Sequence, residues 1–599
     1  MQTGNHRQWI LGLIILLMLP LIPFATSTDS GSQPAVNQPA TTLSYIVQAS
    51  SAEVATRYVN LAGGEVTDTL SIINAVGALL TTEQSEWLQS QPEQIKVFDN
   101  GTLEISGGKP KKGRPKPGPV EGMGTEVEYY IPDAPPAIET WYPMLVGAAD
   151  LHKQGITGKG VTIAVLDTGL WKSPTTEFDT AGKQRILAQH DVTSTGEFYG
   201  DIDDWNGHGT HITSVMISSG RTEAGHYQGI APNANVVAVR AFEPDGSGTY
   251  LNVIRALDWI VSQRKNHNIR ILNLSFGAPA TSLYWNDPVN QAVMAVWKSG
   301  IIVVAAAGNS GPDPMTIGVP GNVPYVITVG AMTDNFTPGD RSDDKMASFS
   351  AAGPTIEGFV KPELVAPGGH MLGQMPPYAW LLLDHPDHIY EADDYFSMSG
   401  TSQATAVVSG VLALMLQEDP RLKPDQAKCR VLASARAALR NDGTHAYSVF
   451  QQGAGLVDAA AAVNETVVDC ANRKMDIKNE IKGQKHYFGP AGIDANEVYY
   501  LVNDAGIRLL GPGYEWDSEA QWSGDALWQQ GPIWNQGKLW GQGKLWPEGK
   551  AWPSGKLWPQ GKLWGTGKLW GTGKLWPEQE FEGAALEQSV SINTWVESE

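Results

Sequence analysis

Between about residue 140 and residue 465, short apolar runs alternate with stretches that have helical periodicity. Four runs are rich in β-branched residues and are candidate buried strands: Val161–Leu166, Val236–Arg240, Ile271–Leu274 and Ile301–Ala305. Helical segments lie between them, for example Leu251–Arg264 and Asp287–Lys298. This alternation predicts an α/β fold with a doubly wound, mostly parallel sheet and helices on both faces. Ligands bind such sheets beyond the carboxyl ends of the strands, where Asp167 and Asn309 lie.

Three short strings carry polar groups in glycine-rich surroundings. They are Leu-Asp-Thr-Gly at 166–169, Gly-His-Gly-Thr-His at 207–211 and Ser-Gly-Thr-Ser at 399–402. Asp167, His208 and Ser402 thus follow one of the chain orders in which serine-nucleophile triads occur. Ser402 also opens an apolar helix, whose free N–H groups and dipole favour negative charge. Each string alone fits a helix cap or a packed core histidine, whereas the three together predict a triad that activates a serine hydroxyl.

Five further strings stand between the second and third of these: Gly229-Ile-Ala-Pro232, Asp245-Gly-Ser-Gly248, Asn273-Leu-Ser-Phe-Gly277, Ala305-Ala-Ala-Gly-Asn309 and Val365-Ala-Pro-Gly368. With the triad strings, they resemble the subtilisin-like serine proteases, the subtilase family, over roughly residues 140–465. The resemblance implies a subtilisin-like fold and peptide-bond hydrolysis through an acyl-enzyme. It implies that Asp167 orients the imidazole, that His208 is general base and then acid, and that Ser402 is acylated. Asn309 is similar to the family's oxyanion donor, acting with the backbone N–H of Ser402.

The resemblance also implies how a protein or peptide substrate is held. Two extended segments are similar to those between which the family binds substrate as an added strand: Gly246, Ser247 and Gly248, and Ser275, Phe276 and Gly277. Thr316–Pro320 resembles the floor of the primary specificity pocket, where Gly318 leaves space and no acid stands in the matching place. Broad specificity follows, with a large apolar or aromatic residue before the scissile bond. Asp313 lies close to this segment in sequence, so a preference for a basic residue before the scissile bond stays open as the alternative.

Several positions depart from the family's pattern. Gln403 and Ala406 stand where the family usually has Met and Pro, and Thr213 with Ser214 replaces a small pair on the histidine helix. These changes bear on rate and packing more than on reaction type. Because position 403 has no sulfur, we expect resistance to mild peroxide unless Met398 is attacked.

The N-terminal part predicts export and a precursor. Charged residues, an apolar run at 9–24 and small residues at 25–27 are typical of a secretory signal over 1–27, with an uncleaved anchor as the alternative. A linker follows at 28–43. Residues 44–106 predict a small α+β (split βαβ) module that resembles the family's inhibitory prodomain, closed by a hairpin of Ile95–Phe98 and Thr102–Ile105 around Asn100-Gly101. The basic Pro/Gly linker at 107–139 is the expected cutting region.

The C-terminal part is expected to comprise a connecting region at 466–510, a repeat at 511–577 and a tail at 578–599. Tryptophan recurs every six residues from Trp516 to Trp576, most clearly as Gly-Lys-Leu-Trp. An even period keeps every Trp on the same side of an extended strand. The Gly and Pro steps break any long strand, so we expect short strands joined by turns, either stacked or as small hairpins. Regular aromatics with lysines can bind a cell-surface or carbohydrate ligand. This motivates a second hypothesis, a surface-binding protein whose protease domain is inactive or incidental, and a spacer or export appendage is a further alternative for the tail.

Composition narrows the partners. A net charge of −21 argues against a general nucleic-acid binder. Cys429 and Cys470 are the only cysteines, and whether they pair stays open. We expect a secreted monomer without an organic cofactor. Structural calcium is implied by the resemblance, and two acidic groups are its candidates, although solvated loops are the alternative: Asp201, Asp203 and Asp204, and Asp340, Asp343 and Asp344.

Overall fold

The computed structural model describes residues 41–105, 138–193, 203–390, 394–503 and 505–516, together with two short strands at 527–529 and 544–545. The predicted signal, most of the basic linker and most of the tryptophan repeat lie outside the described residues. Within the described part of the chain, no helix is long and apolar enough to cross a membrane.

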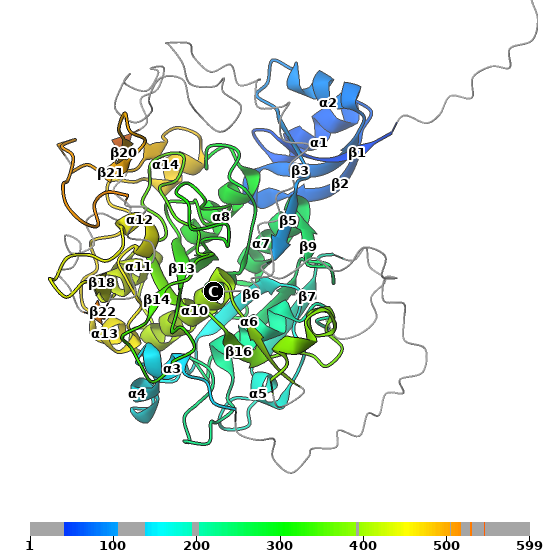
Figure 1. Ribbon diagram of the computed structural model, residues 1–599. Helices are drawn as coiled ribbons and strands as arrows, with labels where there is room; N and C mark the ends of the chain where they lie inside the picture. Colours follow the sequence, from blue (N-terminus) through cyan, green and yellow to red (C-terminus); the bar gives the residue numbers. More distant parts are fainter. Residues whose placement is uncertain are drawn as a thin grey trace, which may run out of the picture. The chain divides into compact units, whose positions relative to one another are not determined.

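The main domain is built on an eight-stranded sheet, with strand order β14-β13-β12-β10-β6-β8-β7 and β15 paired with β13. Figure 1 labels β6, β7, β13 and β14 of this sheet. Its strands are β6 (Thr162–Asp167), β7 (Ile186–Asp191), β8 (Asn235–Arg240), β10 (Ile269–Leu274), β12 (Ile302–Ala306), β13 (Ile327–Thr333), β14 (Lys345–Met346) and β15 (Leu364–Pro367). All pairs are parallel except β13 with β14. The predicted mostly parallel α/β sheet is confirmed.

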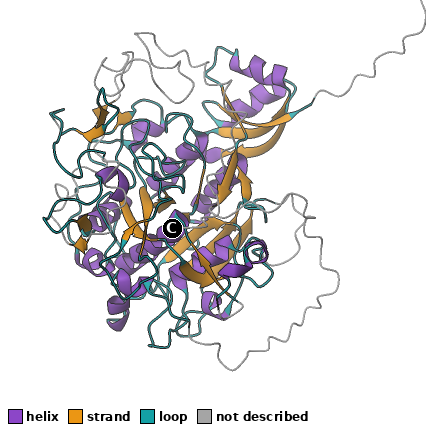
Figure 2. Cartoon of the chain, viewed as in Figure 1, coloured by secondary structure: helices purple, strands orange, loops and turns teal. Residues whose placement is uncertain are grey.

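Helices cover this sheet (Figure 2). The longer ones are α6 (His208–Ile217), α7 (Tyr250–Gln263), α8 (Pro288–Ser299), α10 (Thr401–Glu418) and α11 (Pro424–Ala433). α10 packs against α6 and against β10, β12 and β13, while α7 packs beside α8, with α7 also touching β6 and α8 touching β12. Because helices cover the central strands, every residue of β6 and β12 is buried, whereas the edge strand β7 carries polar residues and is only partly buried.

Shorter elements connect these layers and shape their edges. They are α3 (Tyr142–Leu145), α4 (Ala148–Lys153), α5 (Pro174–Glu177), β16 (Met371–Gln374), α9 (Trp380–Asp384), η2 (Pro386–His388), β17 (Tyr395–Met398), β18 (Ala437–Leu439), α12 (Val449–Gln452) and α13 (Ala459–Asn464). β16 and β17 form an antiparallel hairpin beside α6.

An N-terminal module precedes this domain. It comprises β1 (Leu43–Gln48), α1 (Ala52–Leu61), β2 (Glu65–Leu70), η1 (Ser71–Ile73), β3 (Ala75–Leu80), α2 (Thr82–Gln89) and β4 (Lys96–Asp99). The strands form an antiparallel sheet in the order β2-β3-β1-β4, and α1 and α2 cover an apolar core of their own. The opposite face meets α7 and α8, since Ile46, Ile73 and Ala75 belong to the main core.

The predicted hairpin at the end of this module is wrong. β5 (Thr102–Ile105) does not pair with β4 but lies between β9 (Ser247–Thr249) and β11 (Phe276–Gly277), antiparallel to both. The turn at Asn100-Gly101 is held by the main domain: the Asn100 side chain accepts from the backbone N–H of Leu251 at 2.9 Å, and the Gly101 carbonyl accepts from that of Tyr250 at 2.9 Å. β5 therefore forms backbone hydrogen bonds along both of its edges, whereas a hairpin with β4 would pair only one edge.

The C-terminal segment packs on the main domain. A disulfide between Cys429 and Cys470 ties it to α11. It contains α14 (Ile477–Ile481), β19 (Tyr487–Phe488), β20 (Ala491–Ile493) and β21 (Tyr499–Leu501). Two strands from the tryptophan repeat add to it and to the domain: β22 (Leu527–Gln529) pairs with β18, and β23 (Lys544–Leu545) pairs with β19.

Candidate active site

Asp167 and His208 meet in the interior. Asp167 ends β6 and His208 begins α6, and their Oδ1 and Nδ1 atoms lie 2.7 Å apart. Both side chains are buried. A carboxylate only accepts, so Nδ1 carries a proton, and in the neutral imidazole Nε2 then has the free lone pair. That Nε2 atom is buried and has no hydrogen-bond partner among the described residues, which leaves it free to accept a proton.

The residues just before His208 determine its position at the start of α6. Gly207 has a φ of 102° in the left-handed region, and a Cβ there would collide with Met375 Sδ, so glycine is required. Asp204 caps the helix, accepting from the backbone N–H groups of Gly207 at 2.8 Å and Thr210 at 2.7 Å. The glycine-rich string is thus the entry turn of α6.

Ser402 lies in the first turn of α10, which packs against α6. Its hydroxyl donates to the carbonyl of Ser275 at 3.0 Å. Among the described residues, no hydrogen bond joins the hydroxyl to His208. Asp167 and His208 are therefore in contact, while Ser402 stands on the neighbouring helix with its hydroxyl turned to the strand-forming segment 275–277.

Asn309 follows β12 and faces the start of α10. Its Oδ1 accepts from the backbone N–H and the hydroxyl of Thr401, each at 2.9 Å. These bonds fix the amide orientation, and in the described chain no acceptor meets its nitrogen. Because the first N–H groups of a helix lack acceptors within it, the N–H of Ser402 is a second donor at this helix end. Together they can stabilise an oxyanion.

The two predicted substrate segments flank β5. Leu103 is opposite Gly248, Glu104 is opposite Ser247 and Gly277, and Ile105 is opposite Phe276. Gly246, with a φ of 79°, makes the turn before β9. The segments therefore hold an extended strand, here one from the chain itself, and Leu103 is fully buried within it.

The segment Thr316–Pro320 borders this region. Val319 and Ala278 exchange backbone hydrogen bonds of 2.7 and 2.9 Å, and the N–H of Gly318 donates to Ala307 at 3.1 Å. Gly318 is buried, whereas Asp313 is exposed. The segment thus lies beside the strand partners 275–278 and the run that leads to Asn309.

His211 and Gln403 are two further residues of the site, whose contact sequence reasoning missed. His211 lies in the first turn of α6, next to Gln403 of α10. His211 donates from Nε2 to the carbonyls of Met371 and Phe396, each at 3.1 Å, and its Nδ1 lies 3.5 Å from the Gln403 amide. Burial, with a smaller effect of His208, lowers the pKa of His211 to about 4. A neutral imidazole therefore supports the residue next to Ser402.

The acidic groups proposed for calcium serve other purposes where they are described. Asp201 lies outside the described residues, Asp203 accepts from the Tyr378 hydroxyl, and Asp204 caps α6. Asp340 binds Ser342, Asp343 binds Thr337, and Asp344 pairs with Arg341. In the described part of the chain, no three acidic, His or Cys side chains converge as a metal site. Calcium also takes backbone carbonyls, amide oxygens and water as ligands, so structural calcium stays a prediction.

Comparison with known proteins points to one family. The subtilase family model matches residues 158–455. Serine protease AprX of Bacillus subtilis (strain 168) is 39% identical over 317 residues, which cover 52% of this chain and 67% of that protein. Subtilisin DY of Bacillus licheniformis is 30% identical over 320 residues, covering 53% and 96%. Fervidolysin from Fervidobacterium pennivorans, a keratinolytic enzyme related to subtilisin, shares the fold at a TM-score of 0.55 and 20% identity, covering 80% of this chain and 68% of that one.

Proposed function

Because the chain belongs to the subtilase family of subtilisin-like serine proteases, we propose that it is a secreted endopeptidase using Asp167, His208 and Ser402. The observation that carries the proposal is the 2.7 Å bond between Asp167 and Nδ1 of His208, which directs Nε2, a buried atom without a hydrogen-bond partner in the described chain, to the side that is free for a proton. This is the arrangement that a general base requires.

The reaction proceeds in two halves. The Ser402 hydroxyl turns from the Ser275 carbonyl to His208, gives its proton to Nε2 and attacks the substrate carbonyl carbon. Asp167 stabilises the imidazolium, and the new oxyanion accepts from Asn309 and the Ser402 N–H. His208 then protonates the leaving amine, the C–N bond breaks, and an acyl-enzyme remains. Water, deprotonated by His208, hydrolyses the ester and restores Ser402.

Substrate binds as a strand between β9 and β11. The pairing of β5 in this place supports the proposal, since backbone ladders accept many sequences. A buried apolar side chain at the position of Leu103 adds selectivity. Gly318, with no acid in the matching place of the sequence, favours a large apolar or aromatic residue before the scissile bond.

The N-terminal module acts as an inhibitory prodomain, and the chain is made as a precursor. β5 occupies the substrate cleft, and polar contacts hold the module on α7 and α8. These include Arg255 to Asp68 at 2.9 Å, Gln48 to Gln291 at 2.6 Å and the Ser71 N–H to Asp258 at 3.2 Å. Export by the signal at 1–27 and release by cleavage in the linker at 107–139 complete this scheme.

Two measurements test the function. We expect the wild-type chain to hydrolyse casein and to lose its N-terminal module, by mass spectrometry, while Ser402→Ala does neither. A serine-directed phosphonate should label Ser402 and should still do so in Ser409→Ala, a control on the same helix. Equal casein hydrolysis by wild type and Ser402→Ala would refute the proposal.

A further inference from the structure

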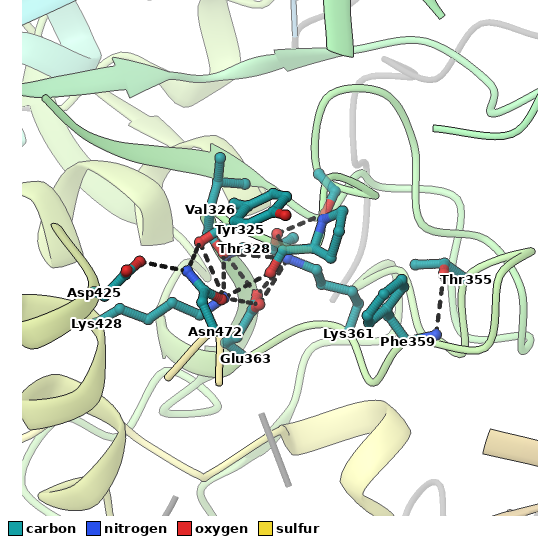
Figure 3. Close-up of polar contacts among 12 residues, drawn as sticks. Tyr325, Val326, Thr328, Thr355, Phe359, Lys361, Glu363, Asp425, Lys428 and Asn472 are labelled. Carbon is teal, nitrogen blue, oxygen red and sulfur yellow. Dashed lines mark hydrogen bonds and ion pairs between the residues drawn. The ribbon is translucent and has the colours of Figure 1, made fainter. Parts of the chain in front are cut away.

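Two lysines lie wholly inside the main domain and share one carboxylate (Figure 3). Lys361 Nζ lies 2.7 and 2.9 Å from the two oxygens of Glu363, 2.9 Å from the hydroxyl of Thr328 and 3.2 Å from the carbonyl of Val326. Lysine is almost never fully buried unless it is paired. Here two lysine side chains meet a single Glu, and burial lowers the pKa of Lys361 to about 7. Backbone carbonyls, the Thr328 hydroxyl and the side-chain oxygen of Asn472 accept their other hydrogen bonds.

Lys428 has a shell like that of a bound cation. Its Nζ lies 2.9, 3.2 and 2.9 Å from three consecutive carbonyls, those of Pro324, Tyr325 and Val326. Glu363 Oε1 is at 2.7 Å and Asn472 Oδ1 at 3.4 Å. Converging carbonyls and a carboxylate are oxygen ligands of the kind that hard cations take. The ammonium group therefore holds the backbone of 324–326 in one arrangement.

Lys361 is linked to the beginning of the same loop, residues 321–326. Thr328, which binds Lys361, donates its hydroxyl proton to the carbonyl of Gly321 at 2.6 Å. The next residue, Asn322, donates its N–H to the Gly318 carbonyl at 2.8 Å. Lys361 is thus connected through one hydroxyl to the turn that closes Thr316–Pro320.

We propose that Lys361 and Lys428 position the floor of the substrate pocket, Lys428 as a tethered cation and Lys361 through its hydrogen bonds to Glu363 and Thr328. They are positioning residues, because they reach no reacting atom and act through loop 321–326 on Gly318. The inference rests on the proposed peptidase function and on the assignment of Thr316–Pro320 to the residue before the scissile bond.

The test uses the full chain and a pair of peptides that carry Phe or Ala before the scissile bond. Thr328→Val removes the connecting hydroxyl at constant shape, and Lys428→Ala removes the ammonium group. For both, KM for the Phe peptide should rise about tenfold with kcat changed less than about twofold, while the Ala peptide is little affected. Lys265→Ala, an exposed lysine, is the control and should match wild type.

Chemical rescue separates positioning from general damage. Lys428→Ala refolded with n-propylammonium, the fragment removed, should regain the wild-type KM, whereas tetramethylammonium at equal ionic strength should not restore it. If Lys428→Ala fails to fold, the Thr328→Val kinetics decide. An unchanged Phe/Ala preference in folded Thr328→Val, with active wild type, overturns this inference alone. An inactive wild type instead overturns the proposed function and this inference with it.

Discussion

Leu103→Ala should weaken the hold of the N-terminal module on the main domain. Leu103 is fully buried in the main core, and β5 keeps its backbone ladder when the side chain is shortened. Truncation of a buried leucine to alanine costs about 2–5 kcal/mol. At about 1.4 kcal/mol per tenfold, the dissociation constant of the module should rise by about 30- to 4,000-fold.

Dilution of the cleaved chain measures this constant. The initial rate of hydrolysis of a chromogenic peptide is followed over a concentration series, and activity appears where the module dissociates. Leu103→Ala should move that midpoint to higher concentration by the same factor. Leu61→Ala, on the same module but 65% exposed, is the matched control and should leave the midpoint in place. A shared midpoint for the two variants would refute the view that β5 occupies the substrate cleft.

Three further outcomes are expected. Asn309→Ala should lower kcat by about 100- to 1,000-fold with a small change in KM, because one oxyanion donor is lost; an unchanged kcat in steady-state assays removes it from the site. Burial raises the pKa of Glu357 to about 7, so the native state keeps its proton after the unfolded state loses it, and stability falls as pH rises from 4.5 to 7. In Glu357→Gln, the free energy of unfolding should fall by roughly 3 kcal/mol less than in the wild type between pH 4 and pH 8. Equal falls in the two proteins would contradict this. Gln403→Met should shorten the half-life of activity in dilute peroxide, since a thioether then lies next to Ser402; equal half-lives would contradict this.

Local pattern was sufficient for the strands and the helices that carry the predicted chemistry. The four predicted buried strands correspond to β6, β8, β10 and β12, with bounds that agree within two residues. Their β-branched composition reflects burial on both faces, which is a property of each strand by itself. The positions of Asp167 and His208 at element ends were predictable for a related reason. The end of a strand or helix and the glycine-rich turn beside it are formed by residues that are adjacent in sequence.

Contacts with distant segments of the chain, which can override a local signal, could not be predicted in the same way. Asn100-Gly101 is a strong local hairpin signal, yet β9 and β11, more than 140 residues further along the chain, offer β5 two edges. β2 was missed because Glu65, Thr67 and Asp68 make its sequence polar. Lys361 and Lys428 read as surface residues from type alone, and only the shell around Glu363 shows why they are buried. The pairing of the cysteines likewise depended on a distance across the fold.

The resting position of Ser402 follows from the way the cleft is filled. Its hydroxyl donates to Ser275, the residue directly before the last ladder partner of β5, Phe276. A substrate strand that runs one residue past this point brings a backbone N–H to the level of that same carbonyl. Competition for one acceptor weakens the bond that holds the hydroxyl away from His208, whose Nε2 has no other partner in the described chain. Strand binding and activation of the nucleophile are therefore expected to be coupled through the backbone of Ser275.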